Sequence, residues 1–295
     1  MQKHRTRVVC SAMLVVALAA LGLAGSAQAK LVGEFTRFAQ CPYKNAEVRK
    51  CIYSVTESGE VVLGNKVVPI TKPVTLQGGA GPINEAEVAK FYAASNGITL
   101  SKAPQNVPGG LLGIVPEASS PALVKALIKF FLENSLTGVN STLELAKTAS
   151  DITISESALA EEQGVALHMP VKVHLENPFL GKNCFVGSSS SPINWNLTTG
   201  KTSPPAPNTS ITGAGGEASF LEEGRIIQIK NNKMVDNAWS APTATGCGGI
   251  LSFLVTPIIN AQLGTTTAGH NTAILKGTVS SAASFAVNKN DEEHP

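Results

Sequence analysis

The sequence predicts a β-dominant α+β fold: an antiparallel β-sandwich or incomplete barrel with one or two apolar helical segments packed against it. Residues 165–176 alternate between an apolar and a largely polar face, which is typical of a strand with one side on the core. Residues 60–70 read as two strands joined by a two-residue turn. Charged residues make up only 15% of the chain and aromatic residues 5%, a profile of extracellular β-rich domains with many turns.

Residues 1–29 have the order of parts found in a secretory signal peptide. Three basic residues come before the uncharged run from Val8 to Leu23, and residues 27–29 offer a small-residue cleavage site. The basic residues are Lys3, Arg5 and Arg7. We therefore expect residues 1–29 to be removed and the mature protein to begin near Lys30, outside the cytosol.

The charge of the predicted mature chain is close to neutral. Without the three basic residues of the signal peptide, 20 Lys and Arg residues stand against 21 Asp and Glu residues. Such a chain, without a basic cluster, lacks the electrostatic footprint of a nucleic-acid-binding protein. The sequence has no lipoprotein acylation pattern, no Leu-Pro-x-Thr-Gly sorting signal and no C-terminal apolar span. We expect a secreted protein, extracellular or non-covalently associated with the cell envelope, with no transmembrane span in its mature form.

Four cysteines remain in the mature chain: Cys41, Cys51, Cys184 and Cys247. An even number in an oxidising compartment favours two disulfides, for which three connectivities exist. We favour Cys41–Cys51 with Cys184–Cys247, because each pair lies within one half of the chain. The alternative is a four-cysteine zinc site, but no two cysteines have the Cys-x2-4-Cys spacing of such sites. No metal or other cofactor is predicted.

The first elements of the mature chain are strands. Residues 52–55 are a plausible short strand, and residues 60–63 and 66–70 form the two arms of a hairpin around Gly64 and Asn65. Glycine in the first turn position suits a type II′ turn, which matches the twist of the flanking strands.

A predicted loop and a predicted helix follow the hairpin. The glycine-rich residues 77–82 are expected to be a loop, and no Gly-Lys-Ser/Thr follows them, so they do not match a phosphate-binding loop. Residues 121–133 predict a helix in which Ser120 is the cap and Pro121 stands in the first turn. The apolar arc of this helix is wider than a surface helix needs.

Residues 165–176 are the clearest strand. Pro170 stands on its outward face, which favours an edge strand or a bulge because proline cannot donate to a sheet ladder. Residues 142–145 and 151–155 are weaker strand candidates before it, and a short strand is possible around Trp195.

The C-terminal part of the chain predicts a strand at residues 225–230 and a closing strand within residues 275–287. Residues 250–263 are apolar and broken at Pro257, and they remain ambiguous between a short buried helix and a strand. Residues 289–295 are polar and are expected to fray. We expect one β-rich extracellular domain over residues 30–288.

Short segments spread over nearly the whole mature chain carry a family resemblance. They lie at residues 38–42, 63–70, 75–79, 177–184, 196–200, 204–208, 236–238, 246–249 and 271–278. In this order they resemble a group of uncharacterised secreted proteins of high-GC Gram-positive bacteria (Actinobacteria). The resemblance implies a bacterial source and export to the wall or medium. It implies no activity, because that family has no agreed one.

The residues that could serve catalysis form weak patterns. His168 and His174 share the outward face of one predicted strand, roughly 20 Å apart along it, so one metal ion cannot bind both directly. His270 lies in a loop of small residues and is the best candidate for a general base, with Asp151 or Asp236 as its acid. The sequence has no Gly-x-Ser-x-Gly, Ser-x-x-Lys or His-Glu-x-x-His motif. We expect a protein that is not an enzyme, with a secreted hydrolase as an alternative.

Three apolar segments, residues 111–115, 122–132 and 250–263, stand out among the strands. They either complete the core or line a pocket for an acyl chain or other apolar ligand, or helix 121–133 docks on a membrane surface or a protein partner. The residues predicted to line such a pocket are Leu111, Leu112, Leu123, Leu127, Phe130, Phe131, Leu254 and Ile258. The favoured function is a non-enzymatic surface binding or structural role toward an envelope component or protein partner. The first alternative is an extracellular carrier of an apolar small molecule or lipid.

Overall fold

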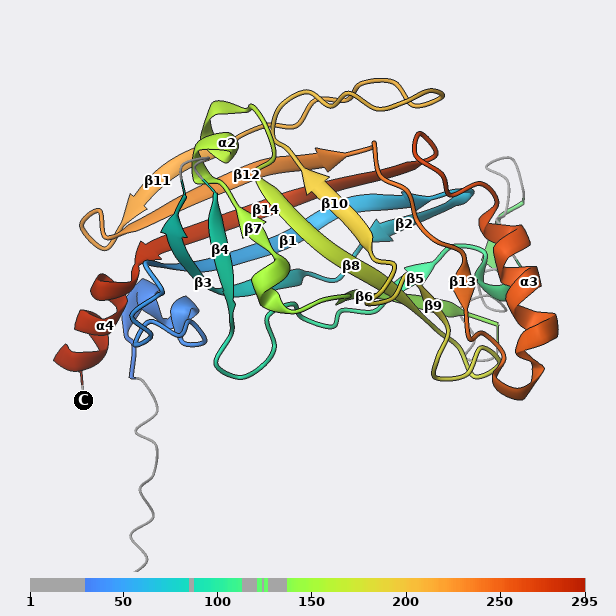
Figure 1. Ribbon diagram of the computed structural model, residues 1–295, viewed down its shortest axis with the longest axis horizontal. Coiled ribbons are helices and arrows are strands. Elements are labelled where there is room, and N and C mark those ends of the chain that lie inside the picture. The colour runs from blue at the N-terminus through green and yellow to red at the C-terminus, as the bar shows by residue number, and fades with distance from the viewer. Residues whose placement is uncertain (1–29, 85–87, 113–120, 124, 127–136, 295) are drawn as a thin grey trace, which may run out of the picture.

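The computed structural model describes residues 30–84, 88–112, 121–123, 125–126 and 137–294. The predicted signal peptide lies outside these residues. The described chain is β-dominant and consists of one antiparallel sheet that curves around an interior core without closing (Figure 1). The predicted fold class is a β-dominant α+β fold, an antiparallel sandwich or incomplete barrel with one or two apolar helical segments. It is confirmed by this unclosed antiparallel sheet with few short helices. None of the described helices combines the length and the apolar character that crossing a bilayer requires.

The strands are β1 (Lys50–Leu63), β2 (Lys66–Ile70), β3 (Val74–Ile83), β4 (Ala89–Ala93), β5 (Gln105–Val107), β6 (Val139–Leu145), β7 (Thr153–Ile154), β8 (Leu167–Glu176), β9 (Phe185–Val186), β10 (Ile193–Leu197), β11 (Glu217–Leu221), β12 (Ile226–Asp236), β13 (Ala244–Thr245) and β14 (Asn271–Ala283). The helical segments are η1 (Gly33–Phe38), η2 (Gly110–Leu112), η3 (Ala149–Asp151), α2 (Glu156–Glu161), η4 (Gly249–Leu251), α3 (Ser252–Leu263) and α4 (Ser284–Glu293). The ambiguous apolar segment at 250–263 is therefore helical.

The main path of the sheet runs β11-β12-β14-β1-β3-β4-β7-β8-β6-β5. β2 extends the sheet from β1, and β9 and β10 pair with the free side of β8. The edge strand β5 lies near β2, but a side chain joins them instead of a backbone ladder. Gln105 Oε1 accepts hydrogen bonds from the backbone N–H groups of Thr71 and Lys72, at 2.9 and 3.0 Å. This side-chain link marks the place where the barrel remains incomplete.

The predicted hairpin is confirmed. β1 and β2 pair with Leu63 opposite Lys66, and Gly64 between them has a φ of 55°. Because successive side chains of a strand point to opposite faces, Lys66, Val68 and Ile70 share the face that looks into the barrel.

The glycine-rich residues 77–82 form the middle of β3, so the predicted loop is wrong. A Cβ on Gly78 would clash with the carbonyl oxygen of Tyr92, and one on Gly79 would lie 2.7 Å from Val48 Cγ1. These glycines allow close approach of neighbouring chain within a paired strand, and composition alone does not distinguish that role from a turn.

Strand β8 is central, which corrects the expectation that Pro170 marks an edge or a bulge. On one side β8 pairs with β7 through His168 and with β6 from Val171 onward. The Pro170 carbonyl accepts from the backbone N–H of Ala146 on that same side, at 3.0 Å. Since the N and O of one strand residue point the same way, the missing proline N–H falls where the partner changes from β7 to β6.

The predicted helix at residues 121–133 is described only in part, and the predicted frayed tail at residues 289–295 is wrong. The predicted helix 121–133 is described at 121–123 and 125–126, where 122–123 and 125–126 are helical; the rest lies outside the described residues. The tail at 289–295 was expected to fray, but residues up to Glu293 belong to α4. Asn290 Oδ1 accepts from Val32 N at 3.0 Å, and Asp291 pairs with Lys44, so polar contacts hold a segment without an apolar face.

The sheet has a core on each face. The larger core lies in the barrel interior, while a smaller one lies on the outer face at one end, under η1 and α4. Phe35 and Phe38 fill the smaller core and are almost fully buried. The favoured disulfides are both present: Cys41–Cys51 belongs to the smaller core and Cys184–Cys247 to the larger one, with Cα–Cα distances of 5.5 and 4.1 Å.

Candidate ligand-binding cavity

The barrel interior contains a cavity of about 120 Å³. A cavity needs roughly 10–15 Å³ to hold one water molecule, so this space is far larger than an ordinary packing defect. Its walls come from β1, β2, β3, β5, β6, β8, β10, β12 and β14, and from η2 and α3 at one end of the barrel. The cavity is therefore built by elements from both halves of the chain.

The cavity wall is almost entirely aliphatic. Its strands contribute inward-facing valine and leucine side chains, for example Val68 and Ile70 on β2 and Val173 and Leu175 on β8. Aromatic side chains bury 150–250 Å² each and fill space efficiently, but Trp195 is the only aromatic residue among the described lining residues. A barrel lined by branched aliphatic side chains leaves its centre open.

Helix α3 lies across the end of the barrel where the cavity is found (Figure 1). Ile259 and Leu263 face the cavity and are buried, and Gln262 Nε2 donates to the backbone oxygen of Leu111 at 2.6 Å. The backbone oxygen of Leu263 accepts from Asn65 N, in the β1–β2 turn, at 2.8 Å. These contacts fix the helix against two of the elements that form the cavity wall.

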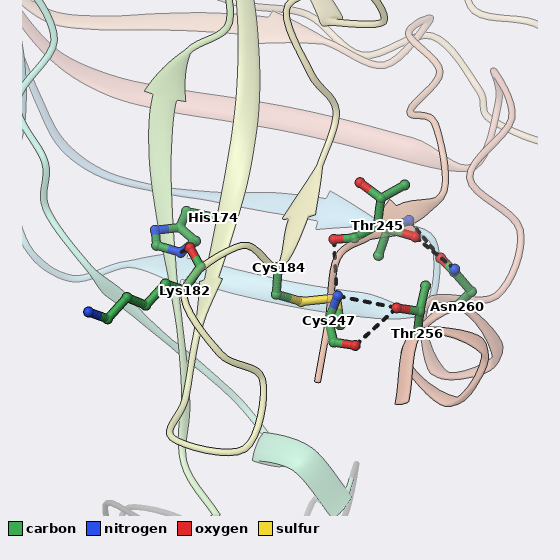
Figure 2. Close-up of a disulfide and its surroundings, with 8 residues drawn as sticks. His174, Lys182, Cys184, Thr245, Cys247, Thr256 and Asn260 are labelled. Atoms are coloured by element: carbon green, nitrogen blue, oxygen red, sulfur yellow. Dashed lines mark hydrogen bonds between the residues drawn. A yellow bond between two sulfur atoms is a disulfide. The ribbon is translucent and has the colours of Figure 1, made fainter. Parts of the chain in front are cut away.

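The second disulfide holds α3 from its other side (Figure 2). Thr256 Oγ1 accepts from Cys247 N at 3.2 Å and donates to Cys247 O at 3.1 Å. Asn260 forms a matching pair with Ala244, in which Oδ1 accepts from the backbone N–H at 2.7 Å and Nδ2 donates to the carbonyl at 3.0 Å. The Cys184–Cys247 disulfide therefore joins α3 and the segment 244–247 covalently to the residues that precede β9.

Lys66 is the only charged residue among the described residues that line the cavity. It occupies an inward position of β2 and is half-buried, so that its side chain borders both the cavity and solvent. Burial lowers the pKa of the Lys66 ammonium group from its ordinary value. Within the described residues Lys66 has no ion pair.

Trp195 carries the second unmatched polar group of the wall. Its side chain is buried, and its Nε1–H has no hydrogen-bond acceptor within the described residues. A buried donor without a partner costs roughly 1–3 kcal/mol. By contrast, the Gln105 amide is engaged on both sides, accepting from Thr71 and Lys72 and donating to Lys72 and Ala103 oxygens.

The residues predicted to line a pocket are placed differently from one another. Leu111 lines the cavity. Leu254 and Ile258 belong to α3 but are 54% and 57% exposed, because α3 turns Ile259 and Leu263 inward instead. Leu123 is 71% exposed. Side chains of the other four predicted residues lie outside the described ones: Leu112, Leu127, Phe130 and Phe131.

Sequence reasoning missed Lys66 as a cavity residue, although a signal for it exists. The hairpin fixes which residues of β2 share a face, and Lys66 has the same parity as Val68 and Ile70. A lysine on the apolar face of a strand beside a known turn is unusual enough to mark a position for inspection.

The candidate catalytic residues are not brought together. Within the described residues the His270 imidazole has no hydrogen bond to a serine or a carboxylate, and no cluster of His, Cys, Asp and Glu has the arrangement of a metal site. Asp236 accepts from the backbone N–H groups of Asn196 and Ala238, at 2.6 and 3.0 Å. Burial raises the pKa of Asp236, and these two hydrogen bonds partly offset that effect.

His168 and His174 lie on the outward face of β8. His168 Nδ1 is 2.7 Å from Asn196 Oδ1, while the His174 ring stacks on Phe185 with a centroid distance of 4.3 Å. Both imidazoles therefore have local partners on the outside of the barrel, and neither faces the cavity.

No family model, curated protein or solved structure shows a significant match to this chain. The resemblance to secreted actinobacterial proteins stays a prediction.

Proposed function

We propose that this is an exported, non-enzymatic protein that binds an apolar small molecule inside its barrel. The observation that carries the proposal is the aliphatic cavity of about 120 Å³ beneath α3. Export is supported by the signal-peptide pattern of residues 1–29 and by two disulfides, which persist in oxidising compartments.

The size of the cavity supports a ligand because proteins pack their interiors densely. Cavities left in a core cost on the order of 24 cal/mol per Å³, which for about 120 Å³ is about 3 kcal/mol. A ligand that fills the space recovers the lost contacts. Empty apolar cavities take up apolar molecules, since water finds too few partners in them.

Decanol is a suitable first probe, because it has a single apolar chain and no charge. Trp195 lines the cavity, so its fluorescence should change as the chain enters. Val68→Phe places an aromatic ring in the cavity and should abolish binding. Val67→Phe is the matched control, since Val67 is the preceding residue, faces outward and is 46% exposed.

The expected result is saturable binding of decanol by the wild-type protein and by the Val67→Phe variant, with none by Val68→Phe. At a free concentration about 100 times Kd, the ligand should stabilise the fold by about 2.7 kcal/mol. If the wild-type protein binds no single-chain probe, or if Val68→Phe binds as well as wild type, the proposed function is wrong.

A surface role is the second candidate, and an exposed apolar face favours it. Ile250 is 97% exposed, and four other large apolar side chains of η4 and α3 are more than half exposed: Leu251, Phe253, Leu254 and Ile258. Residues 249–264 carry no charge. Exposed apolar patches of this kind mark interaction sites in soluble proteins.

The surface role predicts that the double variant Ile250→Ser/Phe253→Ser loses retention on a phenyl-substituted matrix. Phe285→Ser is the control, because Phe285 is also exposed but lies on α4, at the other end of the barrel. Equal loss of retention by both variants would indicate general surface hydrophobicity and would count against a specific surface at α3.

A further inference from the structure

The described wall of the cavity carries charge of one sign only. Lys66 is a hydrogen-bond donor that carries a positive charge, and Trp195 Nε1 is a donor without an acceptor in the described part of the chain. The described wall contains no Asp or Glu. The side-chain amides of Gln105 and Gln262 already donate to backbone oxygens. The wall also includes three hydroxyl groups, which can donate or accept: those of Ser54, Thr56 and Ser141. The one charged group among the described lining residues is a cation.

The position of Lys66 is as informative as its charge. Residues Val68 and Ile70 of the same face of β2 continue the aliphatic wall away from it. Lys66 is only half-buried, and it follows the β1–β2 turn, where Asn65 contacts the end of α3. The ammonium group thus stands at the edge of the apolar space. This is the arrangement that an amphiphile requires, with a chain in the cavity and a head group at its rim.

We infer that the ligand is a single-chain carboxylate, a fatty-acid-like amphiphile whose head pairs with Lys66 while its chain occupies the cavity. This inference rests on the proposed function. One ammonium group balances one monoanion, whereas a phosphate dianion would leave charge uncompensated, because the described lining residues include no second cation. A carboxylate accepts charge-assisted hydrogen bonds from an ammonium group, which are about twice as strong as neutral ones.

The cost of burying the Lys66 ammonium group also favours a carboxylate ligand. Burial lowers the pKa of Lys66, so the folded protein already bears part of the cost of desolvating this ammonium group. A carboxylate at the rim would offset that cost, whereas an alcohol of the same chain length would offset much less. Removing one member of a desolvated pair is destabilising, and a ligand carboxylate supplies the missing member.

The experiment compares decanoate, decanol and acetate on the wild-type protein and on three variants: Lys66→Met, Lys66→Arg and Lys72→Met. Wild type should bind decanoate about tenfold more tightly than decanol, which corresponds to one charge-assisted contact. Lys66→Met should lose this preference and keep decanol binding, because methionine preserves the apolar stem. Lys66→Arg should retain the preference. Lys72→Met is the control, since Lys72 is exposed and does not line the cavity.

The outcomes separate this inference from the proposed function. If decanol and decanoate bind equally to wild type, or if Lys66→Met keeps the preference for decanoate, the carboxylate inference is overturned while the cavity still binds apolar chains. If acetate binds as tightly as decanoate, Lys66 is an ordinary anion contact and the amphiphile inference is overturned. If none of the chain-bearing probes binds, the proposed function itself fails.

Discussion

The two ends of the barrel are built by opposite means. At one end, Phe35 and Phe38 from η1 pack on the outer face of the sheet in one buried cluster with Cys51 and Ala282. At the other end, α3 lies over an interior lined by valine and leucine, and the cavity remains. The first end combines aromatic packing with the Cys41–Cys51 disulfide, whereas the second relies on the Cys184–Cys247 disulfide and on hydrogen bonds to α3.

The difference between the two ends indicates that a protein can keep a cavity where hydrogen bonds and a disulfide hold the wall in place. An end that gains little from dense packing needs other restraints, and here they are polar and covalent. Asn271 is fully buried, donates through Nδ2 to three backbone oxygens and accepts from Gly64 N at 3.0 Å. Asn260 and Thr256 anchor α3 in the same manner. The walls of the cavity are thereby fixed without filling it.

The largest effect should come from removing the disulfides one at a time. In the chain-entropy model the stabilisation grows with the enclosed loop, about 4 kcal/mol for the 63-residue separation of Cys184–Cys247 and about 3 kcal/mol for the 10-residue separation of Cys41–Cys51. Denaturant unfolding of the two Cys→Ala double variants measures both. Only the Cys184/Cys247 variant should also lose decanol binding. A larger loss of unfolding free energy in the Cys41/Cys51 variant than in the Cys184/Cys247 variant would contradict the greater dependence of the α3 end on its disulfide.

Asn271→Ala should have the next largest effect, about 3 kcal/mol, because it leaves buried backbone oxygens without donors. Asn194→Ala is the control; Asn194 lies on β10 with an exposed side chain, and its replacement should change stability by less than about 0.5 kcal/mol. The free energy of unfolding, measured in denaturant, tests both. Equal losses in the two variants would contradict a special role for Asn271 at the end of the barrel that α3 covers.

The sequence predicted those parts of the fold that depend on local periodicity. The strand predicted at residues 165–176 is present from Leu167 to Glu176, although Val165, which the alternation assigns to the core face, is exposed. The hairpin at Gly64 and the disulfide pairing follow from spacing and parity, and both are present. The strand through Gly78 was missed, since glycine at a close approach between strands resembles glycine in a turn. The ordered end of α4 was missed because polar contacts hold it, and these leave no hydrophobic period.

The cavity could be predicted only as a possibility. Whether apolar side chains fill a barrel depends on the sum of their volumes across several strands. The residue pattern of one segment does not give that sum. Residues 250–263 are apolar on all sides, so the sequence does not distinguish the inward Ile259 from the exposed Ile258. Lys66 could have been found from the parity of β2, because the turn fixes its face.

Adding volume should separate the two ends by about 2 kcal/mol. Ala282→Leu inserts side-chain atoms into the packed outer core, where overpacking costs about 1–3 kcal/mol. Val68→Phe adds more atoms, but into the cavity, and should change stability by less than about 1 kcal/mol. Thermal and denaturant unfolding compare them. If Val68→Phe destabilises the protein as much as Ala282→Leu, the interior is full and the cavity is not available to a ligand.

The smallest effect concerns the outside of the hollow end, where Glu144 on β6 lies between Lys102 and Lys172, at 2.8 and 3.4 Å. Burial acts to raise the pKa of Glu144, but the two ammonium groups outweigh it and hold the pKa below its ordinary value. The carboxylate therefore contributes stability above the unfolded-state value of about 4.3, and this contribution is lost as pH falls through the depressed pKa.

Glu144→Gln should cost about 1 kcal/mol at neutral pH, because its partners are largely at the surface although Glu144 itself is only 14% exposed. The difference from wild type should shrink toward zero as the pH falls through the depressed pKa, where wild-type Glu144 takes up its proton. Glu217→Gln is the control, since Glu217 is exposed and makes no ion pair within the described residues. A difference that stays constant, or grows, on acidification would show that Glu144 does not brace the cavity wall through its charge.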